Sequence, residues 1–226
     1  MEFFPCGLKI NDKNDMLHFI KFKKSYENFL ALKIDDLIID PGIYWIRGIN
    51  GSGKSTLLKT IAGILSFDGN ILLNNSIGIK KQDVAYRKLV NFAEAEPVFP
   101  EFLSGKEMIN LFATAKDARV GQEQHFIESM KMQTYVDRPI GTYSSGMLKK
   151  LSIVLAFMGN PKLILLDEPL ITLDGESLDV LYQLISEKHQ QDGTSFFLSS
   201  HQDLNRNNFF SAKKLLVEMK TLKPDF

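Results

Sequence analysis

Residues 48–56 of the chain read GINGSGKST, a glycine-rich stretch that ends in a lysine, a serine and a threonine. The spacing G-x-x-x-x-G-K-[ST] is the pattern of a phosphate-binding loop. The apolar run at residues 43–46 predicts a buried strand before it, and residues 57–62 predict a helix that ends at Gly63. A strand, a glycine loop and a helix in this order form the context in which such a loop binds phosphate.

The residues of this loop have distinct expected tasks. Its glycines allow the positive φ and the close backbone approach that wrapping a phosphate requires. Lys54 supplies a point charge for the β- and γ-phosphates of a nucleotide, and Ser55 supplies a hydroxyl for Mg²⁺. The residues that we expect to bind the nucleotide here are Asn50, Gly51, Ser52, Gly53, Lys54, Ser55 and Thr56.

Composition narrows the class of protein. The chain has 226 residues, of which 44% are hydrophobic and 24% are charged, as is ordinary for a globular protein. Its 27 Lys and Arg balance its 27 Asp and Glu, so no nucleic-acid partner is expected. The single cysteine, Cys6, excludes an intrachain disulfide. Neither a secretory signal nor a bilayer-spanning apolar run is recognisable, so we expect any membrane-crossing part in another chain.

The rest of the chain alternates between strand and helix patterns. Residues 17–22 and 29–34 predict strands of an antiparallel edge layer. Ser104 and Glu107 have the spacing of a capping box at the start of a helix. Further strands are expected at residues 70–74, 88–92, 162–167, 194–199 and 215–219, and helices at 104–132, 145–158 and 176–189.

This alternation predicts an α/β fold. Strands that alternate with helices favour a mainly parallel sheet with helices on both faces. We therefore expect a P-loop NTPase core with a mainly parallel sheet, an antiparallel β edge subdomain and a helical subdomain. The helical subdomain is expected at about residues 98–158, inside a single nucleotide-binding domain that spans residues 1–226.

A second motif, LILLDEP at residues 163–169, places two acids at the end of an apolar strand. The carboxyl ends of strands form the ligand-binding edge of an open α/β sheet. Asp167 is suited to hold Mg²⁺, and Glu168 is suited to polarise a water for in-line attack on the γ-phosphate. A strand that merely runs into a polar loop is the alternative, which the phosphate loop upstream disfavours.

Between these motifs, residues 143–147 read YSSGM. With its motifs in this order, the chain resembles the ATP-binding-cassette (ABC) transporter ATPases over about residues 19–216. The usual signature of that family is Leu-Ser-Gly-Gly-Gln, and the Tyr-Ser-x-Gly-Met form is similar to that of exporter-type and antibiotic-resistance ATPases. The resemblance implies that Ser144, Ser145 and Gly146 bind the γ-phosphate of ATP held by the other subunit of a head-to-tail dimer. From the residues alone, they make only a helix cap.

Three smaller matches to the family follow. Asp174 lies in a loop that resembles the one coupling the two nucleotide sites, and it also suits the N-cap of the next helix. His201 is similar to the switch histidine that contacts the γ-phosphate and positions Glu168, although a lone histidine after a strand usually has no special role. Tyr26 stands at the place of the adenine-stacking aromatic, with a packed or surface tyrosine as the alternative.

Residues 92–102 contain one departure and one open question. The family usually has a Gln where this chain reads FAEAEP, and Ala95 aligns with it. Either Glu94 or Glu96 replaces its contact to Mg²⁺ or water, or the contact is lost. Residues 97–102 carry apolar side chains, which either border a groove for a helix of the membrane partner or pack against the helical subdomain.

The resemblance implies an ATPase subunit of an ABC transporter, with an exporter expected from the signature. It implies ATP and Mg²⁺ as cofactors, a homodimer or heterodimer of ATPase subunits, a polytopic membrane permease subunit as partner, and a cytoplasmic location, peripheral on the inner face of the cell membrane. An importer ATPase and a soluble ABC ATPase of the iron–sulfur assembly type are the alternatives. The implied catalytic residues are Glu168, His201 and Lys54, and the implied metal ligands are Ser55 and Asp167.

Overall fold

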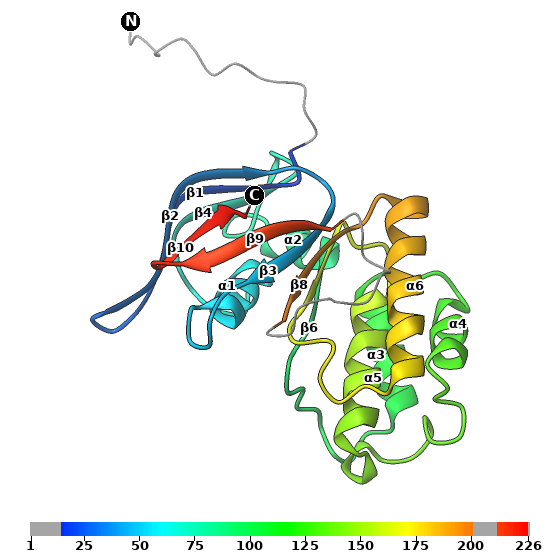
Figure 1. Ribbon diagram of the computed structural model, residues 1–226. Coiled ribbons are helices and arrows are strands. Elements are labelled where there is room, and N and C mark those ends of the chain that lie inside the picture. Colours follow the sequence, from blue (N-terminus) through cyan, green and yellow to red (C-terminus); the bar gives the residue numbers. More distant parts are fainter. Residues whose placement is uncertain (1–14, 201–211, 226) are drawn as a thin grey trace, which may run out of the picture.

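Two β-sheets and a group of helices make up the fold. Figure 1 shows the computed structural model, which describes residues 15–200 and 212–225. The strands are β1 Leu17–Tyr26, β2 Phe29–Ile39, β3 Ile43–Arg47, β4 Asp68–Leu73, β5 Ile77–Gly78, β6 Val90–Ala93, β7 Leu163–Leu166, β8 Ser195–Ser199, β9 Lys213–Glu218 and β10 Thr221–Pro224. The helices are α1 Lys54–Ile61, α2 Asp83–Leu89, α3 Gly105–Ala115, α4 Gln122–Ser129, α5 Ser145–Phe157 and α6 Gly175–Asp192, with a 3₁₀ turn η1 at Ile140–Thr142.

The larger sheet has six strands in the order β10-β9-β3-β8-β7-β6. All neighbours pair in parallel except β10, which runs antiparallel to β9. Every residue of β7 and β8 is buried, as is typical of parallel strands covered on both faces. The predicted α/β class with a mainly parallel sheet is confirmed.

The smaller sheet is antiparallel, with the order β2-β1-β4-β5. Strands β1 and β2 form a long hairpin in which Leu17 pairs with Ile39 and Tyr26 pairs with Phe29. In Figure 1 this sheet lies at the upper left, away from helices α3 to α6. The expected antiparallel edge layer is confirmed, and both of its first strands are longer than the sequence pattern indicated.

Alternate residues of β7 feed two separate cores. Ile164 and Leu166 join the core that includes helices α5 and α6, whereas Leu163 and Leu165 join the core around α1 and the smaller sheet. This division follows from the two-residue period of a strand. Helix α1 is therefore fixed between the two sheets, which holds its N-terminus at the end of β3.

The helical part differs from the expectation in one respect. The predicted helix at residues 104–132 is wrong, because the chain forms α3 and α4 with a break between them. Asp117 has φ 50° and Gly121 has φ 81°, so neither continues a right-handed helix. The capping box at Ser104 and Glu107 is confirmed, since the side chain of each residue accepts a hydrogen bond from the backbone N–H of the other.

The residues around β6 also differ from the expectation. The predicted strand at 88–92 begins only at Val90, because helix α2 extends to Leu89. The short strands β5 and β10 were not predicted. The remaining predicted elements are present within a few residues of their expected bounds.

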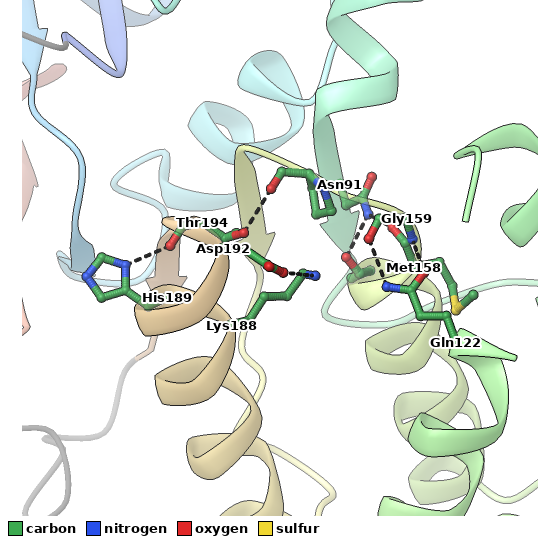
Figure 2. A network of polar contacts seen from close by, with 10 residues as sticks. Asn91, Gln122, Met158, Gly159, Lys188, His189, Asp192 and Thr194 are labelled. Atoms are coloured by element: carbon green, nitrogen blue, oxygen red, sulfur yellow. Dashed lines mark hydrogen bonds and ion pairs between the residues drawn. The ribbon is translucent and has the colours of Figure 1, made fainter. Parts of the chain in front are cut away.

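Amide side chains fasten the helical part to the large sheet (Figure 2). The buried Asn91 of β6 donates to the carbonyls of Ala156 and Met158, at 2.8 Å each. The side-chain amide of Gln122 both donates to and accepts from the backbone of Gly159, at 2.9 Å each. These bonds fix the ends of α4 and α5 beside the amino ends of the parallel strands, beside a pocket of about 480 Å³.

Within residues 15–200 and 212–225, no helix combines the length and the apolar character needed to cross a membrane.

Candidate active site

In the loop between β3 and α1, the backbone at Gly48 is packed tightly against neighbouring atoms, whereas the backbone at Gly51 is not. Gly48 has φ 154°, and a Cβ atom there would lie 2.5 Å from Ser52 Oγ and 2.6 Å from the Val217 carbonyl oxygen. Gly51 has φ 75°, and apart from its chain neighbours no atom of the described residues lies within 4 Å of such a Cβ. The loop is therefore packed tightly against β9 at its start and faces open space at its middle, where a phosphate can approach the backbone.

Lys54 is the first residue of α1 and is buried inside the loop. Its Nζ donates to the carbonyl oxygens of Gly48 at 2.8 Å and Ile49 at 3.3 Å. Burial lowers the pKa of the Lys54 ammonium, while the nearby carboxylates of Glu168 and Asp167 oppose that shift. The loop thus holds a cation at its centre, close to both acids of the second motif.

The buried hydroxyl of Ser52 tests whether this loop fits a phosphate. Its Oγ has no hydrogen-bond partner among the described residues. Leaving a buried hydroxyl unpaired costs about 1–3 kcal/mol, so a partner in the bound state is favoured. A phosphate oxygen satisfies such a donor, and it also receives the N–H groups at the start of α1.

The two acids follow β7, as the sequence indicated. Asp167 Oδ1 accepts hydrogen bonds from Ser55 Oγ at 3.2 Å and from Ser199 Oγ at 2.6 Å. The backbone N–H of Glu168 donates to the same Ser199 hydroxyl at 3.1 Å. Both acids are buried, and Glu168 adopts φ 44°, in the left-handed region that non-glycine residues rarely occupy. The fold therefore brings Lys54, Ser55 and both acids together.

The donors around Asp167 fit Mg²⁺. Ser55 and Asp167 present a hydroxyl and a carboxylate side by side, and Mg²⁺ prefers such oxygen ligands. No cluster of three or more metal-binding side chains occurs in the described part of the chain. Two protein ligands suffice for Mg²⁺ in a nucleotide site, because it keeps several waters and binds phosphate oxygens.

Ser199 is a site residue that the sequence analysis did not assign. It ends β8, the parallel neighbour of β7, so its hydroxyl reaches the acid that follows β7. The local signal for it is a polar residue that ends an apolar strand, which places it at the ligand-binding edge of the sheet, whereas its pairing with Asp167 depends on β8 lying beside β7.

Tyr26 closes one side of a pocket beside the loop. Its hydroxyl lies 3.4 Å from Thr56 Oγ1, and Lys24 Nζ lies 4.6 Å from the centre of its ring. The pocket measures about 360 Å³ and is bounded by the end of β1, the start of β2, the phosphate loop and the turn between β9 and β10. The tyrosine is 44% exposed, so a large part of its ring is open to a ligand.

The signature residues lie at the exposed N-terminus of α5. Ser144 Oγ accepts from the backbone N–H of Met147 at 3.3 Å, so the expected helix cap is present. Ser144 and Ser145 are exposed, and Gly146 lies against the carbonyl oxygen of Thr172 rather than against the phosphate loop. The structure thus leaves these residues at the surface, apart from the group around Lys54.

Asp174 is the N-cap of α6, which is one of the two roles expected for it. Its Oδ1 accepts from the Ser177 backbone N–H at 2.8 Å, and its other oxygen pairs with Lys150 Nζ at 3.3 Å. The bond from Ser177 lowers the pKa of the Asp174 carboxyl to about 2.

The other residues expected at the site differ in their surroundings. His201 lies outside the described residues. Glu94 forms an ion pair with Lys59 of α1, while Glu96 is exposed. Asn50 is exposed within the phosphate loop.

The segment after β6 is partly packed against the helical part and partly exposed, and its expected contact with a membrane partner stays a prediction. Phe99 packs against the core of the helical part. Val98 and Phe102 are 90% and 82% exposed, and Leu111 of α3 is also exposed. The segment therefore packs through one aromatic ring and leaves apolar side chains at the surface.

Comparison with known proteins gives a consistent result. The family model described as ABC transporter matches residues 35–171. The cytochrome c biogenesis ATP-binding export protein CcmA of Legionella pneumophila is 33% identical over 166 residues, which cover 74% of this chain and 82% of that protein. The glucosylceramide transporter ABCA12 of Mus musculus is 29% identical over 198 residues, which cover 83% of this chain but only 8% of that protein.

Solved structures show the same fold at lower identity. An ATP-binding subunit of an ABC transporter superposes with a TM-score of 0.82 at 23% identity, covering 92% of this chain and 88% of that one. The dimeric ATP-binding cassette MJ0796, bound to ADP and Pi in a post-hydrolysis state, gives a TM-score of 0.75 at 22% identity, covering 92% and 98%. The chain belongs to the ABC transporter family, as one of its ATP-binding ATPases.

Proposed function

We propose that this chain is the ATP-hydrolysing subunit of an ABC exporter and that it drives a separate polytopic membrane permease. The observation that carries the proposal is the contact of Ser55 with Asp167, with Glu168 next in the chain and Lys54 beside them. This arrangement joins a phosphate loop to an acid pair, which is the minimum needed to bind and cleave a nucleoside triphosphate.

In this proposal each side chain has one task in ATP hydrolysis. The Tyr26 ring stacks on the adenine in the pocket beside the loop. Lys54 exchanges its two loop carbonyls for the β- and γ-phosphate oxygens, which carry charge and are stronger acceptors. The amides at the start of α1 bind the same phosphates.

The acids complete the site. Ser55 and Asp167 hold Mg²⁺, which neutralises charge on the phosphates when it is bound. Glu168 orients a water for in-line attack on the γ-phosphate and accepts its proton. Ser199 positions Glu168 through its backbone N–H. His201 contacts the γ-phosphate, a role that its match to the family motif supports.

Two copies of the chain, or this chain and a similar one, form a head-to-tail dimer in this proposal. Ser144, Ser145 and Gly146 of one copy bind the γ-phosphate held by the other copy. Their exposure at the N-terminus of α5 supports this role, because helix N-terminal amides attract anions. Asp174 lies at the same surface and couples the two sites. Neither copy alone surrounds the γ-phosphate with donors, so closure of the dimer assembles the catalytic site.

The permease contacts the exposed apolar side chains after β6, which include Val98 and Phe102. These exposed apolar side chains can pack against the apolar face of an amphipathic helix from a membrane subunit. Residues 1–226 act as a single nucleotide-binding domain on the inner face of the membrane, with the helical subdomain at about residues 98–158 next to the permease. The likeness to a protein named as an export protein supports outward transport.

Replacement of the proposed base tests the chemistry. Glu168→Gln is expected to keep ATP binding but to lower hydrolysis by at least about a hundredfold, because the amide cannot accept the proton. Equilibrium ATP binding and phosphate release are measured on the same preparation. Glu128→Gln, an exposed acid on α4, is the matched control and leaves both unchanged. Robust turnover by Glu168→Gln refutes the assigned role.

The same variant tests the dimer and the permease. With ATP and Mg²⁺, Glu168→Gln is expected to elute as a dimer in size exclusion, and Ser144→Arg added to it is expected to return the monomer. Where the neighbouring reading frame encodes a polytopic membrane protein, co-expression with it is expected to yield a complex that Phe102→Asp disrupts. A monomer with ATP, or a complex that is indifferent to the Phe102 change, contradicts the respective part of the proposal.

A further inference from the structure

Lys149 is an ammonium buried at the centre of the molecule. It belongs to α5, one and a half turns after Ser144, and its side chain is almost completely buried. Its Nζ donates to the carbonyl oxygens of Asp167 at 2.8 Å, Glu94 at 3.0 Å and Ala95 at 3.2 Å. An ammonium has three N–H donors, so these carbonyls satisfy it completely.

The three carbonyls belong to the two turns that flank the acid pair. Asp167 directly follows β7, and residues 94–95 directly follow β6, its parallel neighbour. The turn at 94–95 is also held from α1, because the Glu94 carboxylate pairs with Lys59. The backbone of Asp167, the proposed Mg²⁺ ligand, is therefore hydrogen-bonded to α5, the helix that begins with the signature residues.

Burying the Lys149 ammonium without compensating interactions would lower the stability of the folded state. Desolvation lowers the pKa of Lys149 to about 8, while the carboxylates of Asp167, Glu168 and Glu94 oppose the shift. Replacing a buried charged group by an apolar side chain of similar volume is often neutral or stabilising. A role in positioning the turns explains why the chain has a lysine at this point in the core, because an apolar residue cannot bond to three carbonyls.

We propose that Lys149 is a positioning residue for ATP hydrolysis, which ties the signature helix α5 to the main chain that carries Asp167 and Glu168. A displacement of α5, when an anion binds at its N-terminus, is transmitted through this ammonium to the carbonyl of Asp167. The inference rests on the proposed function and adds to it a link between the signature and the acid pair. Lys149 and Lys59 together hold the turn at residues 94–95, one through its carbonyls and the other through the Glu94 carboxylate.

The structure offers a matched control in Lys116. Its Nζ also donates to backbone carbonyls, those of Arg87 and Val90, and burial lowers its pKa to about 8 as well. Val90 begins β6 and Arg87 lies in α2 just before it, so these carbonyls are at the opposite end of the strand from the acid pair. Lys149→Met and Lys116→Met therefore remove similar bonds from the two ends of one strand.

The test compares turnover, ATP affinity and stability of both variants. Both are expected to lower Tm, because both remove hydrogen bonds from backbone carbonyls that are at least partly buried in the case of Val90, Glu94, Ala95 and Asp167. Only Lys149→Met is expected to lower kcat, by at least about tenfold, with the ATP Kd and KM within about twofold of the wild type. Lys149→Arg, which keeps the charge and the donors, is expected to recover at least about fivefold of that loss. Equal kcat losses in both Met variants, or a Lys149→Met kcat within about twofold of the wild type, overturn the inference.

A readout without turnover keeps the inference testable if Lys149→Met does not fold. Lys149→Gln retains a donor and is compared with the wild type by hydrogen exchange. Faster exchange at the amides of residues 94–96 and 167–168 is expected, and unchanged exchange there refutes the link. If Glu168→Gln lowers kcat and Lys149→Met does not, only the role of Lys149 is refuted. If Glu168→Gln hydrolyses ATP as fast as the wild type, the proposed function is refuted.

Discussion

Replacing Gly48 by alanine is expected to destabilise the protein far more than replacing Gly51, although both glycines belong to the same loop. A Cβ atom at Gly48 would lie 2.5 Å from Ser52 Oγ and 2.6 Å from the Val217 carbonyl oxygen. The Ser52 hydroxyl can rotate away, but the Val217 carbonyl is part of β9, so the strand or the loop must shift.

The magnitudes follow from strain and crowding. A non-glycine residue in a sparsely populated φ region costs about 1–3 kcal/mol, and overpacking costs a further 1–3 kcal/mol, so we expect about 4 kcal/mol for Gly48→Ala. At Gly51 only the backbone term applies, because residues 15–200 and 212–225 place no atom within 4 Å of the added Cβ other than those of its chain neighbours. For Gly51→Ala we expect about 1 kcal/mol.

Urea unfolding without nucleotide measures both values. Trp45 is the only tryptophan, it is buried, and it lies in β3 directly before the loop, so its fluorescence reports on this region. Because Gly48→Ala also displaces Ser52, it is expected to weaken ATP binding in parallel. A difference between the two variants below about 1 kcal/mol would show that the loop is not locked against β9, and it would refute the reasoning.

Three further predictions concern other parts of the molecule. Asp174→Ala is expected to lower the free energy of unfolding by about 1 kcal/mol at pH 7. Because the hydrogen bond from Ser177 lowers the Asp174 pKa from 3.8 to about 2, this difference is present above about pH 4 and disappears as the pH falls through 2, which urea unfolding at several pH values measures. Asn91→Leu leaves two buried carbonyls unsatisfied and is expected to cost about 2–4 kcal/mol in the same assay; a neutral effect contradicts the anchoring role. Tyr26→Ala is expected to weaken ATP binding about five- to tenfold in equilibrium titration, and Tyr26→Phe by less than about twofold, because the ring rather than the hydroxyl stacks on adenine; a larger loss in the Phe variant contradicts stacking.

Local patterns predicted the parts of the site that follow strands. The loop at 48–56 and the acids at 167–168 were found because each directly follows an apolar run, and parallel strands end at one edge of the sheet. The contact between Ser55 and Asp167 joins residues 112 positions apart, yet it was predictable because both motifs have known partners in nucleotide sites.

The roles of Ser199 and Lys149 were not predictable in the same way. Ser199 reaches Asp167 only because β8 is the neighbour of β7, and strand order is not encoded in any local pattern. Lys149 stands beside Lys150 in a mainly apolar helix, where a lysine normally indicates the solvent face. Its burial depends on three carbonyls from two separate turns, which only the assembled fold brings together.

The errors in secondary structure have equally local causes. Apolar spacing continues from α3 into α4, and the break between them depends on the left-handed backbone at Asp117 and Gly121, which the periodicity does not reveal. Helix α2 buries only Tyr86, so it lacks the apolar stripe by which a helix is recognised.

The position of β3 in the large sheet has a consequence for folding during synthesis. Its two neighbours, β8 and β9, lie far along the chain, and the bond from Gly42 N–H to Ser195 Oγ joins residues 153 positions apart. Until the ribosome has released β8, this apolar strand has no sheet partner among the described strands, and the loop after it has no β9 to pack against. Such non-local pairing folds slowly and leaves an aggregation-prone edge exposed to solvent. Nascent chains truncated before residue 195 are therefore expected to depend on chaperones for solubility and not to bind ATP.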